Sequence, residues 1–377
     1  MNEHDQHYSY EEDFYSKDRK FFRKERKMAS AKDRSKFKKS DQDQLKKRSS
    51  SIERECNDND LRGRVLAITP EGIVVDNQHS LYTCQLKGSL KQETNRFKNL
   101  VAVGDFVYFA PQSDDEGTIS FIEERRSILS RADNLSRNKE QLIAVNIDQV
   151  LITASVILPP LKPFLIDRYI IAARKGNMEP IIVINKTDYL ESTPSTMDQP
   201  FFEEEKRLYH EFLEIYRNLG ITVLPVSSNT GEGIEALKQS MKGKASVFSG
   251  QSGVGKSSLM NAVTGSNLRV GGIVDKTRKG SHTTTSSHLL PTEDGGFCID
   301  TPGIKSFGIW ELSKQEIQSH FSEIGACSQN CKYPDCLHLQ EPVCAVKDAV
   351  ENGHISRLRF DSYCALMASL SKEHRHR

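Results

Sequence analysis

The sequence predicts a multidomain protein with an N-terminal β-barrel of the OB-fold type, a central α/β domain and a helical C-terminal domain that binds a metal. Three observations predict this architecture. Short apolar strands separated by turn residues follow residue 61, strand and helix patterns then alternate, and cysteines cluster near the C-terminus. The expected boundaries are 1–60 for a basic arm, 61–130 for the barrel, 131–306 for the α/β domain and 307–377 for the metal-binding domain.

The N-terminal arm is strongly basic, although the whole chain of 377 residues carries a formal net charge of only +1 at pH 7. Between Lys17 and Arg48, fifteen lysines and arginines stand against five acidic residues, with few large apolar side chains. Such a segment cannot offset its ordering entropy by burial, so we expect it to be disordered. It suits a polyanion such as RNA through counterion release, and a solubilising tail fits the same composition.

The composition argues against a membrane-spanning protein and against a protein with a secretory signal peptide. No stretch approaches the roughly 18 consecutive apolar residues that a membrane helix needs. The N-terminus is polar and lacks the apolar core of a signal peptide. We therefore expect a cytoplasmic protein without a membrane partner.

The barrel is predicted from five short segments of strand character within about 70 residues, a spacing typical of small barrels. Turn residues such as Thr69–Gly72 and Asp76–Asn77 separate the first three. The segments are 62–68, 72–76, 81–86, 106–109 and 119–122. An OB-fold is favoured, but counting strands does not separate it from an SH3-like barrel or a β-sandwich.

The central domain is predicted from alternating strands and helices, which favour a mainly parallel sheet. The expected strands are 149–156, 181–184, 221–226 and 245–249. The expected helices are 164–175, 203–219, one that begins near Ile234, and one over 258–263. A further helix is expected at 362–372, within the C-terminal domain.

A phosphate-binding loop follows the strand at 245–249. Its pattern is Gly-x4-Gly-Lys-Ser, and the expected nucleotide-binding residues are Gly250, Gln251, Ser252, Gly253, Val254, Gly255, Lys256, Ser257 and Ser258. Glycines let backbone N–H groups converge on a phosphate at a helix N-terminus. We expect Lys256 to bridge the β- and γ-phosphates and Ser257 Oγ to ligate Mg²⁺.

A guanine-reading loop precedes the phosphate loop. The residues Asn185, Lys186, Thr187 and Asp188 close an apolar strand. The Asp188 carboxylate can accept from the N1 proton and the exocyclic amine of guanine, whereas adenine would leave it unpaired. Ser227 and Ser228 resemble the companion loop that supports the base. Together with the phosphate loop, this motif predicts binding of GTP and GDP.

Two switch segments are expected after the phosphate loop. Asp300 should bind Mg²⁺ through water, and the Gly303 N–H should sense the γ-phosphate. Ile304 occupies the position where many GTPases carry a water-orienting glutamine, so another residue must take that role. His282 precedes a run of three threonines, and we expect it to position or polarise water while Thr284 completes the Mg²⁺ shell. A solvated loop histidine is the alternative.

The C-terminal cluster Cys331-x4-Cys336-x-His338-x5-Cys344 offers three thiolates and one imidazole. Such a donor set suits tetrahedral Zn²⁺, and four protein ligands indicate a closed, structural site. Cys327 has a spacing that also permits it to serve as a ligand. The alternative is a group of unrelated buried thiols.

The guanine loop precedes the phosphate loop, which is the reverse of the order in ordinary small GTPases. This order, with Gly280–Thr285, Asp300–Gly303, the cysteine pattern and Phe307–Trp310, resembles the RsgA family of circularly permuted GTPases over residues 61 to 365. The resemblance implies late maturation of the 30S ribosomal subunit, contact with 16S rRNA, ribosome-stimulated hydrolysis and one structural zinc ion. It also implies His282 as the catalytic residue and the four cluster residues as zinc ligands. We further expect a monomer.

One alternative function remains open: an RNA-binding module that uses GTP as a structural ligand. A metal-dependent nuclease finds no support, because the sequence shows no clustered carboxylates for it. The basic arm is longer than the short N-terminus usual in the family, and its role stays open. The reversed order also suggests a mechanical hypothesis. Because the second switch leads directly toward the cysteine cluster, a movement that depends on the γ-phosphate is expected to tilt the metal-binding domain.

Overall fold

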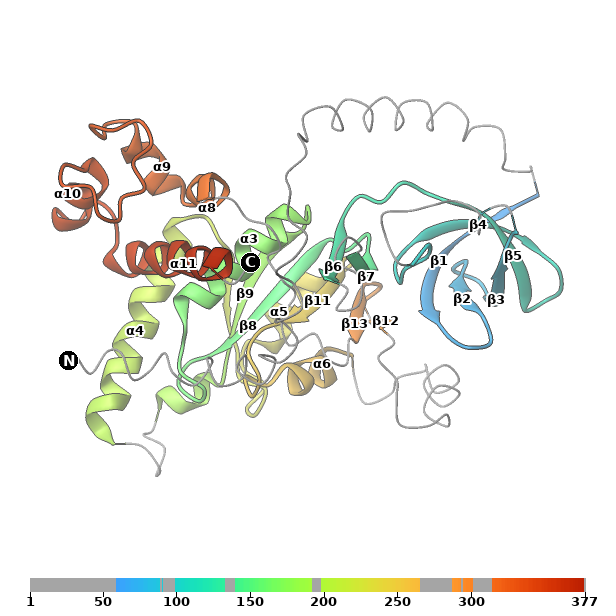
Figure 1. Cartoon of the computed structure of the whole chain (residues 1–377). Helices are drawn as coiled ribbons and strands as arrows, with labels where there is room; N and C mark the ends of the chain where they lie inside the picture. The colour runs from blue at the N-terminus through green and yellow to red at the C-terminus, as the bar shows by residue number, and fades with distance from the viewer. Residues whose placement is uncertain are drawn as a thin grey trace. The chain divides into compact units, whose positions relative to one another are not determined.

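The structure is a computed structural model that describes residues 59–88, 90, 99–132, 140–191, 198–264, 287–292, 294–300 and 314–375. The basic arm expected at 1–60 therefore lies almost entirely outside the described residues. The barrel, the central sheet and the C-terminal helices as far as Met367 belong to one compact unit (Figure 1).

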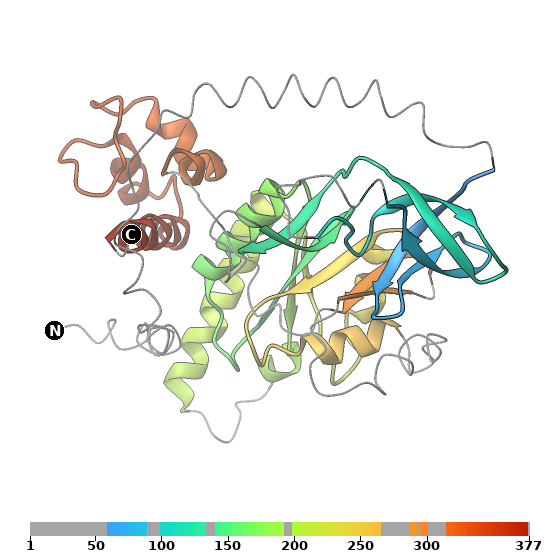
Figure 2. The ribbon, with the colours of Figure 1, turned by 45° about the vertical axis from the view of Figure 1, so that its right-hand side comes forward.

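Five strands form the barrel. They are β1 (Leu61–Ile68), β2 (Ile73–Asp76), β3 (Leu81–Leu86), β4 (Phe106–Pro111) and β5 (Glu116–Ile122). Pairing runs β1–β2–β3–β5–β4 and returns to β1, with β3 and β5 parallel and every other pair antiparallel. Figure 2 shows these strands in blue to teal, curled around a common interior.

The barrel encloses its own core, which includes Val65, Val75, Cys84, Phe109 and Ile119. Val75, Cys84 and Phe109 alternate with more exposed residues along their strands, as a sheet with one buried face requires. The closed five-stranded order confirms the OB-fold among the alternatives that strand counting left open.

A two-stranded hairpin follows the barrel and was not expected from the sequence. Its strands are β6 (Ile128–Ala132) and β7 (Glu140–Val145), paired antiparallel. The buried side chains of Leu129 and Ala144 join the core of the central domain.

The central sheet contains β8 (Gln149–Ser155), β9 (Glu179–Asn185), β10 (Val223–Pro225), β11 (Ala245–Ser249), β12 (His288–Pro291) and β13 (Phe297–Asp300). Its order is β10-β9-β8-β11-β13-β12. The first five strands are parallel, and β12 is antiparallel to β13. The sheet joins the barrel through one residue pair, Ala67 on β1 with His288 on β12.

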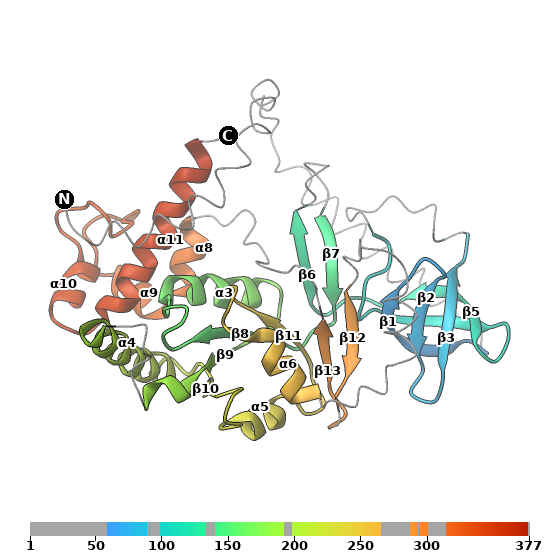
Figure 3. The same cartoon turned by 90° about the horizontal axis from the view of Figure 1, so that it is seen from below.

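Helices cover both faces of the sheet (Figure 3). One face packs against α3 (Pro163–Lys175) and α4 (Gln199–Asn218), and the other against α5 (Ile234–Met241) and α6 (Lys256–Thr264). Successive side chains of a strand point to opposite faces of the sheet, so one strand contributes to both cores. Val150 and Ile152 on β8 belong to the first core, and Leu151 between them belongs to the second.

Several elements differ from their predicted bounds, and α4 and β10 differ for identifiable reasons. Helix α4 begins at Gln199 rather than at residue 203, because Pro200 occupies its first turn, where no N–H is needed. Strand β10 spans Val223–Pro225 rather than 221–226, and among the described strands it pairs with β9 alone, at the end of the sheet order.

The C-terminal region contains α8 (Lys314–His320), α9 (Ser322–Ser328), α10 (Ala345–Glu351) and α11 (Arg357–Arg375). Helix α11 extends beyond the predicted span of 362–372 at both ends. Arg359 of α11 is buried and forms ion pairs with Asp167 of α3 and Glu323 of α9. Within the described part of the chain, no helix combines the length and the apolar character that crossing a membrane requires.

Candidate nucleotide and metal sites

The phosphate loop connects β11 to α6, as the sequence predicts. Gly250 has φ of +142°, and a Cβ there would lie 2.0 Å from the Thr153 carbonyl oxygen on β8. Gly255 has φ of +95°, and its Cβ would lie 2.3 Å from Asn185 Nδ2. Only glycine fits either position, because the loop passes directly against neighbouring backbone and side-chain atoms.

Lys256 folds back over this loop. Its Nζ donates to the carbonyl oxygens of Gly250 and Gln251, each at 2.7 Å. Burial lowers the pKa of Lys256. A negative charge placed beside its Nζ would act in the opposite direction and favour the protonated form. Ser257 and Ser258 are exposed in the first turn of α6, where a helix N-terminus attracts anions.

Asn185 joins three segments of the site. It is fully buried at the end of β9. Its Nδ2 donates to the Val254 carbonyl at 2.9 Å and to Ser228 Oγ at 3.3 Å, and its Oδ1 accepts from the Ser228 N–H at 3.0 Å. The guanine-reading loop, the companion loop and the phosphate loop are therefore held together by one amide.

The Asp188 carboxylate is held by the companion loop. Its Oδ1 accepts from Ser227 Oγ at 2.7 Å, and its Oδ2 accepts from Asn229 Nδ2 at 3.4 Å. Ser227 is itself buried, and its N–H donates to the Glu232 carbonyl at 2.9 Å. These contacts orient the carboxylate that is expected to read guanine.

Lys186 lies between these loops and the segment after β8. Its backbone is left-handed, with φ of +67°, and its Nζ donates to the carbonyl oxygen of Leu158. Burial lowers the pKa of Lys186, while Asp188 acts in the opposite direction. Thr187 is buried beside it and donates its N–H to Val226 at 3.2 Å.

The structure reaches only part of the expected switch machinery. Asp300 ends β13, whose Ile299 pairs with Val247 on β11, so its backbone lies at the same end of the sheet as the phosphate loop. His282, Thr284, Gly303 and the segment Phe307–Trp310 lie outside the described residues.

Several residues that position the expected ones were not predicted from the sequence. These are Leu158, Asn229 and Glu232. Glu232 lies in a Gly-Glu-Gly turn, and the sequence pattern indicates only that a helix begins after this turn. Leu158 acts through its backbone carbonyl, and no side-chain pattern reports that role.

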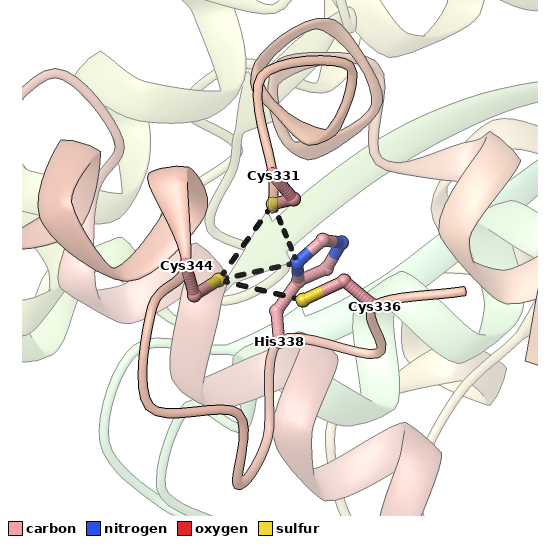
Figure 4. A group of neighbouring side chains, drawn as sticks. All are labelled: Cys331, Cys336, His338 and Cys344. Carbon is pink, nitrogen blue, oxygen red and sulfur yellow. Dashed lines mark hydrogen bonds between the residues drawn. The ribbon is translucent and has the colours of Figure 1, made fainter. Parts of the chain in front are cut away.

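The cysteine cluster is assembled as predicted (Figure 4). Cys331, Cys336, His338 and Cys344 bring one donor atom each to within 4.8 Å of one another. Cys344 Sγ lies 3.8 Å from Cys336 Sγ and 3.3 Å from His338 Nδ1. Cys327 is not a member of this group.

The chemistry of this cluster fits a soft divalent cation. Burial, together with the neighbouring Cys344 and Cys331, raises the pKa of the Cys336 thiol to about 12, so its thiolate requires a positive charge beside it. Three thiols and one imidazole at these separations match the donors and the count of a closed tetrahedral site.

The surroundings of His338 fix its ring. Its Nδ1 faces the sulfurs of Cys331 and Cys344, and its Nε2 lies 3.1 Å from the Gln318 side-chain amide on α8. Its backbone is left-handed, with φ of +61°. The Glu341 carboxylate closes the loop by accepting three backbone N–H groups, from Leu337, Leu339 and Gln340. Burial alone would raise the pKa of Glu341, but these donors lower it.

Comparisons with known proteins point to one family. A family model described as RsgA GTPase matches residues 122–310. A Chlorobaculum parvum protein named small ribosomal subunit biogenesis GTPase RsgA is 40% identical over 287 residues, covering 74% of this chain and 88% of that protein. A Bacteroides fragilis protein of the same name is 36% identical over 309 residues, covering 79% of this chain and 96% of its own length.

Two solved structures have a similar fold. The crystal structure of YjeQ from Thermotoga maritima aligns with a TM-score of 0.65 at 31% identity, over 82% of this chain and 98% of that one. The structure of YloQ, described as a circularly permuted GTPase, aligns with a TM-score of 0.62 at 26% identity, over 84% of this chain and 96% of that one.

Proposed function

This chain belongs to the RsgA family of GTPases, which makes it a hydrolase acting on GTP, and we propose that it works in the biogenesis of the small ribosomal subunit. We further propose that it acts late in 30S maturation, that the ribosome stimulates its hydrolysis, and that it contacts 16S rRNA as a monomer in the cytoplasm. The basic arm over residues 1–60 is a candidate for part of the RNA contact, because a strong positive charge favours polyanions.

One contact gives the strongest support to the proposal that the chain binds GTP at a single site. Asn185 Nδ2 donates to the Val254 carbonyl at 2.9 Å, and so ties the guanine-reading loop to a phosphate loop that comes later in the chain. The reversed order of motifs is therefore compatible with one continuous nucleotide site. The proposed domain division, at residues 61–130, 131–306 and 307–377, follows the same organisation.

The roles of individual residues are proposals from their chemistry. Asp188 reads the guanine edge, and Lys256 with the backbone of residues 250–255 binds the phosphates. Mg²⁺ supplies charge neutralisation at the phosphates when bound. Ser257, Thr284 and Asp300 would hold it, and the Gly303 N–H would sense the γ-phosphate.

His282 is the proposed catalytic residue. The side chain of Ile304 cannot orient water, and an imidazole can donate or accept a hydrogen bond near neutral pH. His282→Ala should therefore remove most of the 30S-stimulated turnover and leave GDP binding unchanged. Unchanged stimulated turnover in this variant would contradict the assignment.

The defining experiment measures phosphate release from GTP alone, with purified 30S subunits and with 50S subunits. We expect stimulation by 30S subunits only. Tight GTP binding without turnover under all three conditions would instead favour the RNA-binding module that uses GTP as a structural ligand. Lys256→Ala serves as a variant that should lose both binding and turnover.

We propose that the cluster Cys331, Cys336, His338 and Cys344 holds one zinc ion with a structural role. Metal analysis of the purified chain should give about one zinc per chain, because four protein donors suit one tetrahedral ion. Cys336→Ser should lower this content strongly. Cys364→Ser, outside the cluster, is the matched control, and Cys327→Ser tests whether that thiol substitutes as a ligand. Full zinc content in Cys336→Ser would refute the proposed ligand set.

A further inference from the structure

The segment between β8 and α3, residues 156–162, borders the nucleotide site. The Leu158 carbonyl accepts from Lys186 Nζ, and the Val156 N–H donates to the Asn185 carbonyl at 3.2 Å. This segment therefore touches two consecutive residues of the guanine-reading loop. We call it the β8–α3 loop.

The β8–α3 loop also approaches the phosphate loop. A Cβ at Gly253 would lie 3.8 Å from Pro159 Cδ. A small pocket between the two loops is lined by Ser155 and Pro160 on one side and by Gln251 and Val254 on the other. The loop is thus placed where a shift in its backbone would change both the base side and the phosphate side of the site.

Two contacts fix the conformation of this loop. Ser155 Oγ, almost fully buried, donates to the Pro159 carbonyl at 2.6 Å. The Glu205 carboxylate on α4 accepts the backbone N–H of Leu161. Leu161 itself is buried in the core beneath the sheet.

Glu205 is an unusual residue for its position. It is 8% exposed on a helix whose neighbouring residues Glu203 and Glu204 face solvent. Burial raises the pKa of Glu205 to about 7, and among the described residues its Oε2 has no hydrogen-bond partner. A buried carboxylate costs free energy unless hydrogen bonds or an opposite charge compensate it, and the backbone N–H of Leu161 in the β8–α3 loop supplies such a hydrogen bond.

We propose that Glu205 is a positioning residue for guanine-nucleotide binding, because it holds the β8–α3 loop whose Leu158 carbonyl anchors Lys186. The chain of contacts runs from α4 through Leu161 and Leu158 to the guanine-reading loop. This inference rests on the proposed function, since it assumes that Lys186 lies beside a bound guanine nucleotide.

The test measures the dissociation constant of a fluorescent GDP derivative. Glu205→Ala removes the acceptor for the Leu161 N–H, so affinity should fall by about three- to tenfold, the effect of one lost hydrogen bond. Glu205→Gln keeps a carbonyl oxygen for that N–H and should restore affinity to within about twofold of wild type. Glu211→Ala, an exposed carboxylate on the same helix, is the matched control.

A double-mutant cycle separates positioning from general destabilisation. Lys186→Met removes the anchor on Leu158, so Glu205→Ala should have no further effect on GDP affinity in that background. Pro160→Gly loosens the same loop and should behave like Glu205→Ala in both backgrounds, which keeps the test valid if the alanine variant folds poorly.

Three results would overturn the inference: wild-type affinity in Glu205→Ala and Pro160→Gly, failure of Glu205→Gln to restore binding, or full additivity with Lys186→Met. Failure of the proposed function has a different signature. In that case the wild-type chain itself would bind the GDP derivative no better than an ADP derivative.

Discussion

At the scale of single residues, Asn185 has a structural task beside its place in the guanine motif. Its amide uses both Nδ2 and Oδ1 to join the phosphate loop and the companion loop. An aspartate at this position could not donate to the Val254 carbonyl. The motif therefore needs an amide here for the architecture of the site, independently of any contact with the base.

Glu205 gives a prediction about stability and pH. Its pKa is raised from an ordinary 4.5 to about 7 by burial, so the folded chain holds this proton more tightly than the unfolded chain. The stability that results is fully present below about pH 4.5 and is lost as the pH rises through about 7. As the pH is raised from 5 to 8, the free energy of unfolding of Glu205→Gln should therefore increase by on the order of 2 kcal/mol relative to that of wild type.

Urea unfolding at these two pH values measures the effect. Glu211→Gln, which replaces an exposed carboxylate on the same helix, should show no such change relative to wild type. An equal difference between wild type and Glu205→Gln at both pH values would show that Glu205 titrates normally.

The sequence predicted residues that act through side-chain identity and missed residues that act through position. Lys256, Asp188 and the four members of the cysteine cluster carry chemistry that their spacing reports. Glu205 resembles any acidic residue on an amphipathic helix, because its burial depends on how α4 packs. Leu158 contributes a carbonyl that every residue type possesses.

At the scale of elements, the phosphate loop shows why its glycines cannot be replaced. Gly255→Ala would place a methyl group 2.3 Å from the Asn185 amide, at φ of +95°. The loop must then move, so we expect nucleotide binding to weaken by at least about tenfold, a loss equal to roughly 1.4 kcal/mol. Equilibrium titration with a fluorescent GDP derivative measures this.

Gly243→Ala is the matched control for backbone strain. Gly243 also has a positive φ, of +67°, but an added Cβ meets open space. It should cost about 1 kcal/mol of stability and leave nucleotide affinity unchanged. Equal losses of affinity in both variants would mean that backbone conformation, rather than the contact with Asn185, sets the requirement for glycine.

Elements with a clear period were predictable, and elements defined by pairing were not. Strand β11 matches its predicted bounds, because a short apolar run leads directly into a glycine-rich loop. The hairpin of β6 and β7 was missed because the segment between the two strands gives no two-residue turn signal. Its place depends on packing against the central core, which a local pattern does not contain. The expected switches at His282 and Gly303 remain predictions.

At the scale of the whole molecule, a buried ion pair between Arg359 and Asp167 joins the C-terminal helices to the central domain. Arg359 pairs with Asp167 of α3 and with Glu323 of α9, at 2.7 Å for the second pair, and Ser362 donates to Asp167. The Arg359 guanidinium also lies 4.2 Å from the centre of the Phe321 ring. Any movement of the C-terminal helices relative to α3 must therefore separate buried charges.

Arg359→Met should destabilise the chain by about 3–5 kcal/mol, because it leaves two carboxylates beside an apolar side chain. Arg357→Met is the control on the same helix, since its pair with Asp361 is exposed, at 72% and 62% for the two side chains. That pair should contribute no more than about 0.5 kcal/mol. Thermal or urea unfolding of both variants measures the difference, and equal effects would indicate that the buried pairs contribute little.

The order of strands in the central sheet has a consequence for how the chain folds as it is synthesised. Strands β8, β9 and β10 leave the ribosome before β11, which then inserts beside β8 in the middle of the finished sheet. Until β11 arrives, β8 presents an apolar open edge, the kind of surface on which nascent chains aggregate. Conditions that slow elongation between Pro225 and Ala245 should therefore raise the aggregated fraction of newly made protein.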